Sequence, residues 1–406
     1  MPLARILDLT RLVSRLGRGP LTGVDRVELA YLDHLRAARD GAPLFALVRL
    51  RTGFALLDAA GAEHIAALAR GAALPERAML RARLANRDPL RARAETAVRA
   101  VAIAFALPPL LPRLLGCLPR GGCYYNTGHA NLTPPLFAAM TRAGLRSSVL
   151  LHDVIPLDHP EYTRPGIPEV FGRKLAAIAA GADRVIHTSH STRQANEAQL
   201  ARCGRVPSGI VAPLGVPPVP PEPYHLAGLD PARPWFLCVG TIEPRKNHAL
   251  LLDVWEMLDR ELPASAMPQL VIAGGRGWRN EAVFRRLDTR PPHVLEIAGL
   301  PDGAVAGLMT GARALLFPTL AEGFGLPPVE AMALDTPAVV SDLPVLREVL
   351  GDYPVYLDKS DVYSWKETVK RLSASDLKGW RRGGAEKKTR IPDWAAHFNS
   401  VLRDGW

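Results

Sequence analysis

Short apolar runs alternate with amphipathic stretches along the second half of the chain. Each run of four or five residues is rich in Val, Leu, Ile or Phe, which is typical of strands buried in a parallel sheet. The stretch at 249–262 places Leu251, Val254, Trp255 and Leu258 at helical spacing. The pattern predicts strands at 235–239, 270–273, 294–298, 314–317 and 337–340, and helices at 249–262 and 327–334.

The first half of the chain alternates in the same way but less regularly. The pattern predicts strands at 5–9, 147–151 and 184–188 and helices at 24–39 and 172–180. Between the halves, the proline density of residues 213–223 excludes helix and central strand and favours a stiff connector. A chain of 406 residues suits two domains. We therefore predict domains over 1–216 and 225–390, a linker over 217–224 and a terminal helical segment over 391–406.

The charge of the chain is unevenly divided. Residues 1–217 hold 28 Lys and Arg against 16 Asp and Glu, whereas residues 218–406 hold 22 against 24. The excess predicts an anionic partner for the first half: nucleic acid, an acidic lipid surface or a phosphorylated acceptor. The alternative is that arginine is simply abundant in this composition. No aromatic residue interrupts the arginine-rich stretch 70–99, which argues against a platform for stacked bases, so we expect no nucleic acid.

Residues 66–118 combine this arginine-rich stretch with an apolar run at 101–112 that prolines interrupt. The run is shorter than the roughly 18 apolar residues of a membrane-spanning helix. Two interpretations stay open: a basic segment lying on an anionic membrane face, and a solvated helix followed by a core segment. The N-terminal residues lack the pattern of a secretory signal, so we expect a cytoplasmic protein, with peripheral attachment to the inner membrane face as an option.

The segment Glu-Gly-Phe-Gly-Leu-Pro-Pro-Val-Glu at 322–330 follows a predicted strand and opens a helix at its prolines. Glycines let the backbone approach a ligand, and a helix start offers unpaired N–H groups to phosphate. We expect Phe324, Gly325 and Leu326 to line a donor site. The carboxylates of Glu322 and Glu330 suit the hydroxyl groups of sugars. The alternative is a loop with two solvated glutamates.

A second group of candidate residues follows the first strand of the C-terminal half. It consists of Gly240, Thr241, Arg245 and Lys246. Loops at the carboxyl ends of parallel strands line the ligand crevice of an open sheet. Arginine binds phosphate through its planar fork and lysine as a point charge, so this pair predicts a diphosphate site. A solvated surface pair is the alternative.

Together with residues 298–301, 310–314 and 341–344, these segments resemble the donor-binding half of GT-B glycosyltransferases of family 4. That family is recognised by a Glu-x7-Glu pattern, which Glu322 and Glu330 match. The resemblance is tight over 235–352 and looser through 126–129, 151–157 and 212–215. It implies an α/β fold of two Rossmann-like domains whose parallel sheets face each other across a cleft, the C-terminal one binding donor and the N-terminal one acceptor. It also implies a terminal helix that packs back on the N-terminal domain. Thr241 stands where many members carry Arg.

The resemblance further implies retaining transfer of a hexose from a nucleoside diphosphate sugar to a glycan or lipid-diphosphate-linked acceptor, in bacterial surface polysaccharide synthesis. It places His152, Asp153 and Glu322 at the catalytic centre and Gly23 and His129 on the acceptor side. No Asp-x-Asp motif follows a strand, so neither a metal nor another cofactor is expected beside the donor. Other interpretations stay open: a phosphorylase, a nucleotide-sugar epimerase, or a non-catalytic module that binds a nucleotide sugar or nucleic acid.

Overall fold

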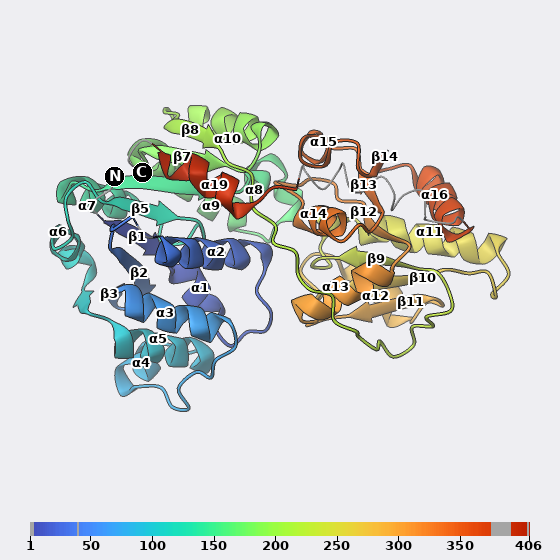
Figure 1. Cartoon of the computed structure of the whole chain (residues 1–406), viewed down its shortest axis with the longest axis horizontal. Coiled ribbons are helices and arrows are strands. Elements are labelled where there is room, and N and C mark those ends of the chain that lie inside the picture. The colour runs from blue at the N-terminus through green and yellow to red at the C-terminus, as the bar shows by residue number, and fades with distance from the viewer. Residues whose placement is uncertain (1–3, 39, 375–390, 404–405) are drawn as a thin grey trace.

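The computed structural model describes residues 4–38, 40–374, 391–403 and 406. The chain forms two lobes that lie side by side, each built around one sheet (Figure 1). The first sheet has the strand order β4-β3-β2-β1-β5-β6-β7-β8, and the second has the order β11-β10-β9-β12-β13-β14. In sequence, the strands of the first sheet precede the proline-rich segment and those of the second sheet follow it. The predicted α/β class is confirmed.

The strands of the first lobe are short and mostly buried. They are β1 (Arg5–Asp8), β2 (Leu44–Leu50), β3 (Gly53–Leu57), β4 (Ala104–Ala106), β5 (Cys123–Asn126), β6 (Arg146–Leu151), β7 (Arg184–His187) and β8 (Ser208–Val211). The central strand β1 pairs in parallel with β2 and β5. Its residues Ile6 and Leu7 are fully buried in separate clusters, because consecutive side chains point to opposite faces of the sheet.

The expectation of a wholly parallel first sheet is wrong at one edge. Strand β3 pairs antiparallel with both β2 and β4. Only Arg51 and Thr52 connect β2 to β3, and a connection of two residues can join antiparallel neighbours but not parallel ones.

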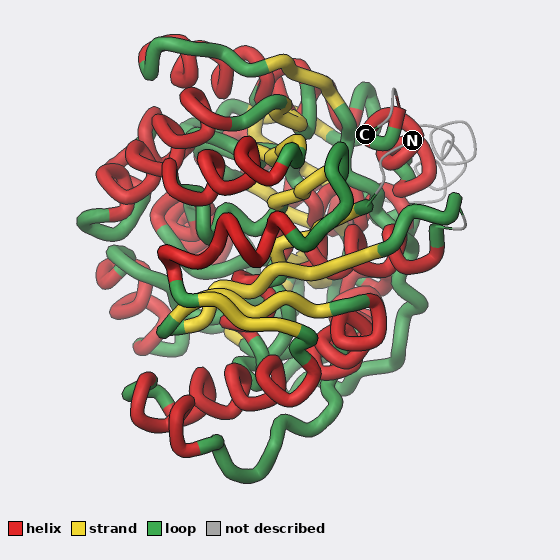
Figure 2. The backbone as a smooth tube through the Cα atoms, turned by 90° about the vertical axis from the view of Figure 1, so that its left-hand side faces the viewer, coloured by secondary structure: helices red, strands yellow, loops and turns green. Residues whose placement is uncertain are grey.

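Helices cover both faces of the first sheet (Figure 2). They are α1 (Thr10–Arg15), α2 (Gly23–Ala37), α3 (Ala59–Ala69), α4 (Leu80–Ala85), α5 (Pro89–Val101), α6 (Leu111–Gly116), α7 (Pro134–Ala143), α8 (Ile155–Asp158), α9 (Ile167–Gly181) and α10 (His190–Arg202), with 3-10 turns η1 (Pro108–Leu110) and η2 (Pro160–Tyr162). Coverage on both faces explains why the strands read as continuous apolar runs rather than alternating ones.

The second sheet is parallel in all its pairings. Its strands are β9 (Trp235–Val239), β10 (Gln269–Ala273), β11 (Val294–Ile297), β12 (Ala314–Phe317), β13 (Ala338–Ser341) and β14 (Val355–Leu357). Its helices are α11 (His248–Glu261), α12 (Glu281–Asp288), α13 (Asp302–Gly311), α14 (Leu326–Ala333), α15 (Pro344–Leu350) and α16 (Val362–Ala374), with a 3-10 turn η3 (Pro244–Lys246). Each predicted strand of this half lies within a residue or two of an observed one.

The last helix, α19 (Trp394–Val401), lies against the first lobe although it follows the second in sequence (Figure 1). Its His397 and Phe398 are buried, and His397 Nε2 lies 2.7 Å from the Tyr31 hydroxyl on α2. Arg184 of β7 donates to the Val401 carbonyl at 2.8 Å. The predicted domain end at residue 390 falls outside the described residues. Among the described helices, none combines the length and the apolar character that crossing a bilayer requires.

Candidate active site

A cleft of about 940 Å³ lies between the two lobes. Its walls come from loops that follow the carboxyl ends of strands in both sheets, the position at which open α/β sheets bind ligands. Nearly all of the predicted site residues line this cleft. They are Gly23, His152, Asp153, Gly240, Thr241, Arg245, Lys246, Glu322, Phe324, Gly325, Leu326 and Glu330.

The two predicted phosphate-binding cations lie together in the turn η3. Arg245 Nη1 and Lys246 Nζ both donate to Glu322 Oε2, at 2.9 and 2.7 Å. Arg245 also pairs with Glu243 at 2.8 Å. The Arg245, Lys246 and Glu322 side chains are 12 to 19% exposed, so little water screens them. The sequence suggested Glu322 as a partner for sugar hydroxyls and, through the resemblance, as a catalytic residue; the structure also makes it the ion-pair partner of both cations.

The charges of Glu322, Arg245 and Lys246 stabilise one another. Burial raises the pKa of the Glu322 carboxyl, but the positive charges of Lys246 and Arg245 outweigh burial and lower that pKa to about 2. Burial lowers the pKa of the Lys246 ammonium, and the nearby carboxylate offsets this only in part. Glu322 is therefore ionised at neutral pH and holds two cations at the floor of the cleft.

The loop before α14 bends where no larger residue fits. Gly325 has φ +88°, and a Cβ there would lie 2.7 Å from Leu346 Cδ2. At Gly323 a Cβ would lie 2.7 Å from the His152 carbonyl oxygen of the other lobe. The helix begins at Leu326, so Glu330 lies in its second turn. The glycines thus set both the helix start and the close approach of the lobes.

His152 and Asp153 reach the cleft from the end of the buried strand β6. The His152 ring donates through Nε2 to the Thr127 carbonyl at 2.7 Å. Burial is the main reason that its pKa falls to about 4, so the ring is neutral at physiological pH. The Asp153 carboxylate accepts from the Ile155 N–H at 3.1 Å, and burial raises its pKa.

His129 is not among the residues that line the cleft. Its ring lies behind that of His152, with the ring centroids 5.1 Å apart, and its Nε2 is 2.9 Å from the Leu150 carbonyl oxygen. Burial lowers its pKa well below the usual histidine range. Its position is that of a support for His152 rather than of a group on the cleft wall.

The sequence analysis missed the arginines of the first lobe that line the cleft. Arg26 of α2 reaches across to Glu330, with 2.6 Å between Nη1 and Oε1. Arg11, Arg15 and Arg18 line the same wall, and their side chains are 31 to 35% exposed. All four lie within fifteen residues of the glycine-rich turn at 17–23, and this local clustering is the signal that could have identified them.

Across residues 4–38, 40–374, 391–403 and 406, no three or more His, Cys, Asp and Glu side chains are grouped as metal ligands.

Comparison with known proteins follows the same division into lobes. Residues 227–387 match the family described as "Glycosyl transferases group 1". The serotype-specific mannosyltransferase WbdA of Escherichia coli is 31% identical over 247 residues, which cover 56% of this chain and 30% of WbdA. The O-antigen chain mannosyltransferase RfbU of Salmonella typhimurium is 46% identical over 176 residues, covering 41% of this chain and 42% of RfbU. The chain thus spans less than half the length of either relative.

Two solved structures resemble the whole chain. HepE of Anabaena in complex with UDP-glucose has a TM-score of 0.60 at 16% identity and covers 98% of both chains. The trehalose-6-phosphate enzyme of E. coli bound with UDP-2-fluoro glucose has a TM-score of 0.62 at 13% identity, with 99% of both chains covered. At these identities the likeness concerns the fold, and the expected GT-B architecture is confirmed.

Proposed function

The chain carries a group 1 glycosyltransferase domain within a GT-B fold, and from this premise we propose that it is a retaining hexosyltransferase that uses a nucleoside diphosphate sugar. The observation that carries the proposal is the group formed by Arg245, Lys246 and Glu322 at the floor of the interlobe cleft. Two largely buried cations beside a helix start suit a diphosphate. Two structural neighbours are described with UDP-sugars, which supports a donor of this chemical class.

In the proposed complex, the donor diphosphate lies on Arg245, Lys246 and the start of α14. Glu330 accepts hydrogen bonds from the hydroxyl groups of the ribose, and Glu322 accepts them from those of the hexose. The reaction breaks the bond between the sugar and the diphosphate, so negative charge grows on the departing oxygen. Cations already held in place stabilise that charge without having to reorganise, which lowers the barrier. No metal is needed in this scheme.

Retention of anomeric configuration is part of the proposal and rests on the Glu-x7-Glu pattern shared with a retaining family. His152 and Asp153 face the transferred sugar from the first lobe. Because His152 is neutral and donates to Thr127, it offers a fixed polar surface rather than a charge. We assign no carboxylate as a nucleophile.

The proposed acceptor is the hydroxyl of a glycan or of a sugar linked to lipid diphosphate. Arg11, Arg15 and Arg18 line the first-lobe wall, where they suit a phosphorylated acceptor. The mannosyltransferase names of the relatives favour mannose or a related hexose, and the O-antigen names favour surface polysaccharide synthesis. With a lipid-linked acceptor, we propose that the enzyme acts at the inner face of the membrane.

Ligand stabilisation and transfer assays test this function. A panel of nucleoside diphosphate sugars is screened by thermal unfolding, since a ligand at a hundredfold over its Kd adds about 2.7 kcal/mol. Lys246→Ala and Glu330→Ala are expected to abolish transfer while the protein stays folded. Lys370→Ala on α16, outside the cleft, is the matched control and keeps full activity. Full activity in either cleft variant would remove the site assignment.

Product analysis with a labelled donor separates the remaining alternatives. A transferase gives a glycoside of the acceptor, and its anomeric configuration is read by NMR. Formation of a sugar phosphate would indicate a phosphorylase, and conversion of the donor to its epimer would indicate an epimerase. Stabilisation by a donor with no turnover would indicate a non-catalytic module.

A further inference from the structure

Exposed apolar side chains gather in one part of the first lobe. Seven of the twelve large hydrophobic residues exposed in the described part of the chain fall between residues 79 and 110. They are Met79, Leu80, Leu84, Ile103, Phe105, Leu107 and Leu110, with exposures from 43 to 77%. We call this set the apolar patch. Single exposed leucines are ordinary, but such a concentration marks an interaction surface.

The members of the apolar patch come from separate elements that are neighbours in the first lobe. The Met79 N–H donates to the Thr96 hydroxyl at 2.9 Å, so the start of α4 lies beside the last turns of α5. Helix α5 ends at Val101 and leads directly into β4, the edge strand of the sheet. Ile103 is fixed beside β3 by its N–H bond to the Leu56 carbonyl, 2.9 Å long.

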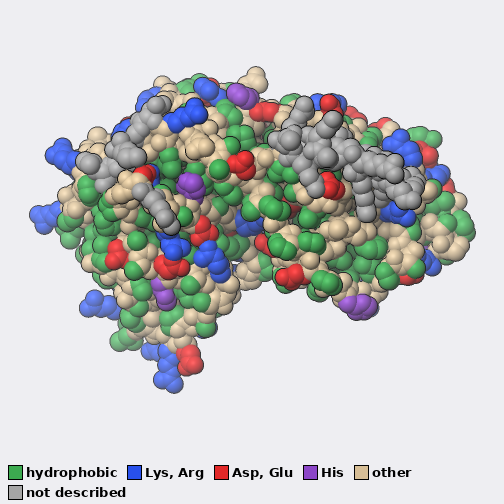
Figure 3. Space-filling model, in the orientation of Figure 1, with side chains coloured by type: hydrophobic (Ala, Val, Ile, Leu, Met, Phe, Trp, Pro, Cys, Tyr) green, Lys and Arg blue, Asp and Glu red, His purple; other side chains and the backbone are tan. Residues whose placement is uncertain are grey.

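The sequence that carries the apolar patch is rich in arginine and poor in acidic residues. Residues 77–120 contain nine arginines: Arg77, Arg81, Arg83, Arg87, Arg91, Arg93, Arg99, Arg113 and Arg120. The acidic residues of this range are Asp88, which pairs with Arg18, and Glu95, which is fully buried; Glu76 lies just before it. Arg99 lies over the ring of Phe105, 5.5 Å from its centroid. Figure 3 shows basic side chains, with an acidic one beside them, at the tip of the lobe just below the α4 label of Figure 1.

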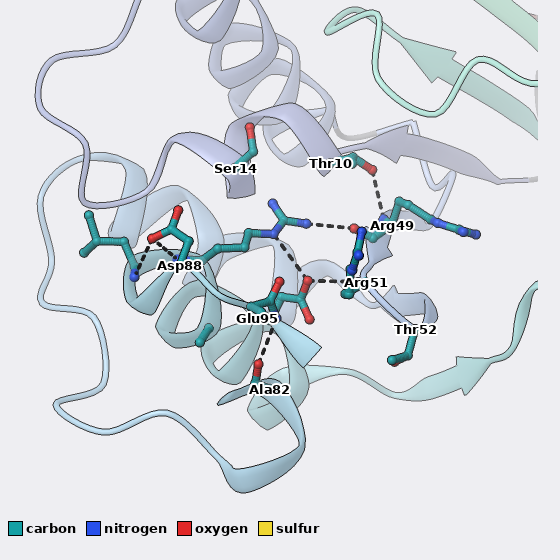
Figure 4. A network of polar contacts seen from close by, with 12 residues as sticks. Thr10, Ser14, Arg49, Arg51, Thr52, Ala82, Asp88 and Glu95 are labelled. Atoms are coloured by element: carbon teal, nitrogen blue, oxygen red, sulfur yellow. Dashed lines mark hydrogen bonds and ion pairs between the residues drawn. The ribbon is translucent and has the colours of Figure 1, made fainter. Parts of the chain in front are cut away.

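The inner side of the same segment is firmly attached to the lobe. Glu95 of α5 accepts from the Arg51 N–H at 2.9 Å and from Arg91 at 3.3 Å, and Arg91 in turn donates to the Arg49 carbonyl (Figure 4). The Asp88 side chain caps α5 by accepting from the Leu90 N–H. The segment is therefore an ordered part of the fold, and its apolar side is left facing outward.

The position of this segment relates it to the acceptor side of the cleft. Arg18, which lines the cleft, forms an ion pair with Asp88 at the start of α5. With α4 and β4 in contact with a bilayer, the first-lobe wall of the cleft would lie beside the lipid headgroups.

From these observations we infer that the apolar patch and its arginines dock on an anionic phospholipid bilayer. Apolar side chains flanked by guanidinium groups match the boundary between acyl chains and negatively charged headgroups. The inference extends the proposed lipid-linked acceptor, but it does not depend on which sugar is transferred.

Flotation of the full chain with vesicles tests this surface. Vesicles of phosphatidylcholine alone are compared with vesicles that also contain phosphatidylglycerol. The wild-type protein is expected to float with the anionic vesicles and less so as salt rises. The Leu80→Ser/Leu84→Ser variant is expected to lose most of this binding, because both side chains are more than half exposed and leave the core intact.

Charge is tested separately from apolar contact. The Arg81→Gln/Arg83→Gln variant is expected to bind anionic vesicles about 25-fold more weakly, at about fivefold for each charge removed. Tyr363→Ser and Arg260→Gln, exposed positions on the second lobe, are the matched controls and bind as the wild type does. Equal flotation with neutral and anionic vesicles, or unchanged flotation of the patch variants, would overturn the inference.

Two further readouts identify the cause of a negative result. If the wild-type chain forms a dimer that the leucine variant dissociates, and no vesicles are bound, the patch belongs to a second copy of the chain and the lipid assignment fails. Transfer to a water-soluble acceptor is expected to be equal in all variants. A chain that floats but transfers no sugar would leave the docking surface standing and refute the proposed function.

Discussion

At the floor of the cleft, one carboxylate oxygen of Glu322 accepts hydrogen bonds from both Arg245 and Lys246. A diphosphate offers several oxygens of the same kind, so the two cations can exchange one anionic partner for another without being left unpaired. This explains how the chain keeps two cations largely buried, since a buried charge costs most when it lacks a partner.

Removal of the Glu322 charge is expected to destabilise the protein. Glu322→Gln leaves Lys246 without an anionic partner, while Arg245 keeps Glu243, so the free energy of unfolding should fall by roughly 3 kcal/mol. Urea unfolding measures this loss. Glu256→Gln is the matched control, because Glu256 is 54% exposed and its ion pairs with Arg260 and Arg286 contribute at most about 1 kcal/mol. Equal losses in the two variants would contradict the account.

At the scale of elements, the turn into α14 depends on a backbone conformation that only glycine adopts without strain. Gly325→Ala is expected to lower the free energy of unfolding by about 1–3 kcal/mol and to weaken donor binding, because φ is +88° and the new Cβ meets Leu346. Gly275→Ala is the control: this glycine also lines the cleft, but its Cβ would meet no atom within 4 Å. Thermal unfolding with and without the donor compares the two, and an equally stable Gly325→Ala variant would refute the argument.

Helix α19 ties the end of the chain to the first lobe through a buried polar contact. His397 Nδ1 lies 2.9 Å from the Pro213 carbonyl, which can only accept, so Nδ1 carries the proton and Nε2 accepts from the Tyr31 hydroxyl. His397→Ala leaves that hydroxyl buried without its partner and should cost roughly 2–3 kcal/mol in urea unfolding. Ser400→Ala, on the exposed side of α19, should cost less than about 0.5 kcal/mol. A loss in His397→Ala no larger than in Ser400→Ala would contradict this role for α19.

The sequence was most informative where local pattern decides the structure. The strands 235–239 and 314–317 were predicted to the residue, because buried parallel strands are short apolar runs that end at polar or glycine residues. The hairpin of β2 and β3 was missed, because no strand was predicted over residues 44–57 and its two-residue connection therefore went unused as a signal. The contact of Arg26 with Glu330 was also out of reach, because it joins residues 304 positions apart. For residues 66–118, α5 is packed inward, but the apolar run at 101–112 is only partly buried, so the expectation of a core segment is wrong for much of it. The membrane-facing interpretation stays a prediction.

At the scale of the whole molecule, acid is expected to destabilise the fold through its buried histidines. Burial is the main cause that lowers the pKa of His187, His248 and His397 to about 4, against about 6.5 in an unfolded chain. The unfolded state therefore binds more protons below pH 6.5, so stability is full above that pH and is lost as the pH falls toward 4. At about pH 5.5 the loss is about 1 kcal/mol for each of these histidines.

Urea unfolding at about pH 7.5 and about pH 5.5 checks this prediction. His248 is fully buried, and neither of its ring nitrogens has a hydrogen-bond partner among the described residues. His248→Phe should therefore reduce the difference between the two pH values by about 1 kcal/mol. An unfolding midpoint that does not change with pH in the wild-type chain would show that these rings are not kept neutral by burial.

The chain passes from one lobe to the other twice, and the two passages run next to each other. Val216, leaving the first lobe, donates its N–H to the carbonyl of Pro392, on the return, at 3.0 Å. Gly215 packs directly on the backbone of Trp394, where no side chain could be inserted. Two adjacent connections allow the lobes to rotate relative to each other about the line that joins these connections, and they resist rotation about other axes. The lobes are therefore expected to open and close by a hinge rotation about a single axis, so that each closure returns Glu322 to the same place opposite His152.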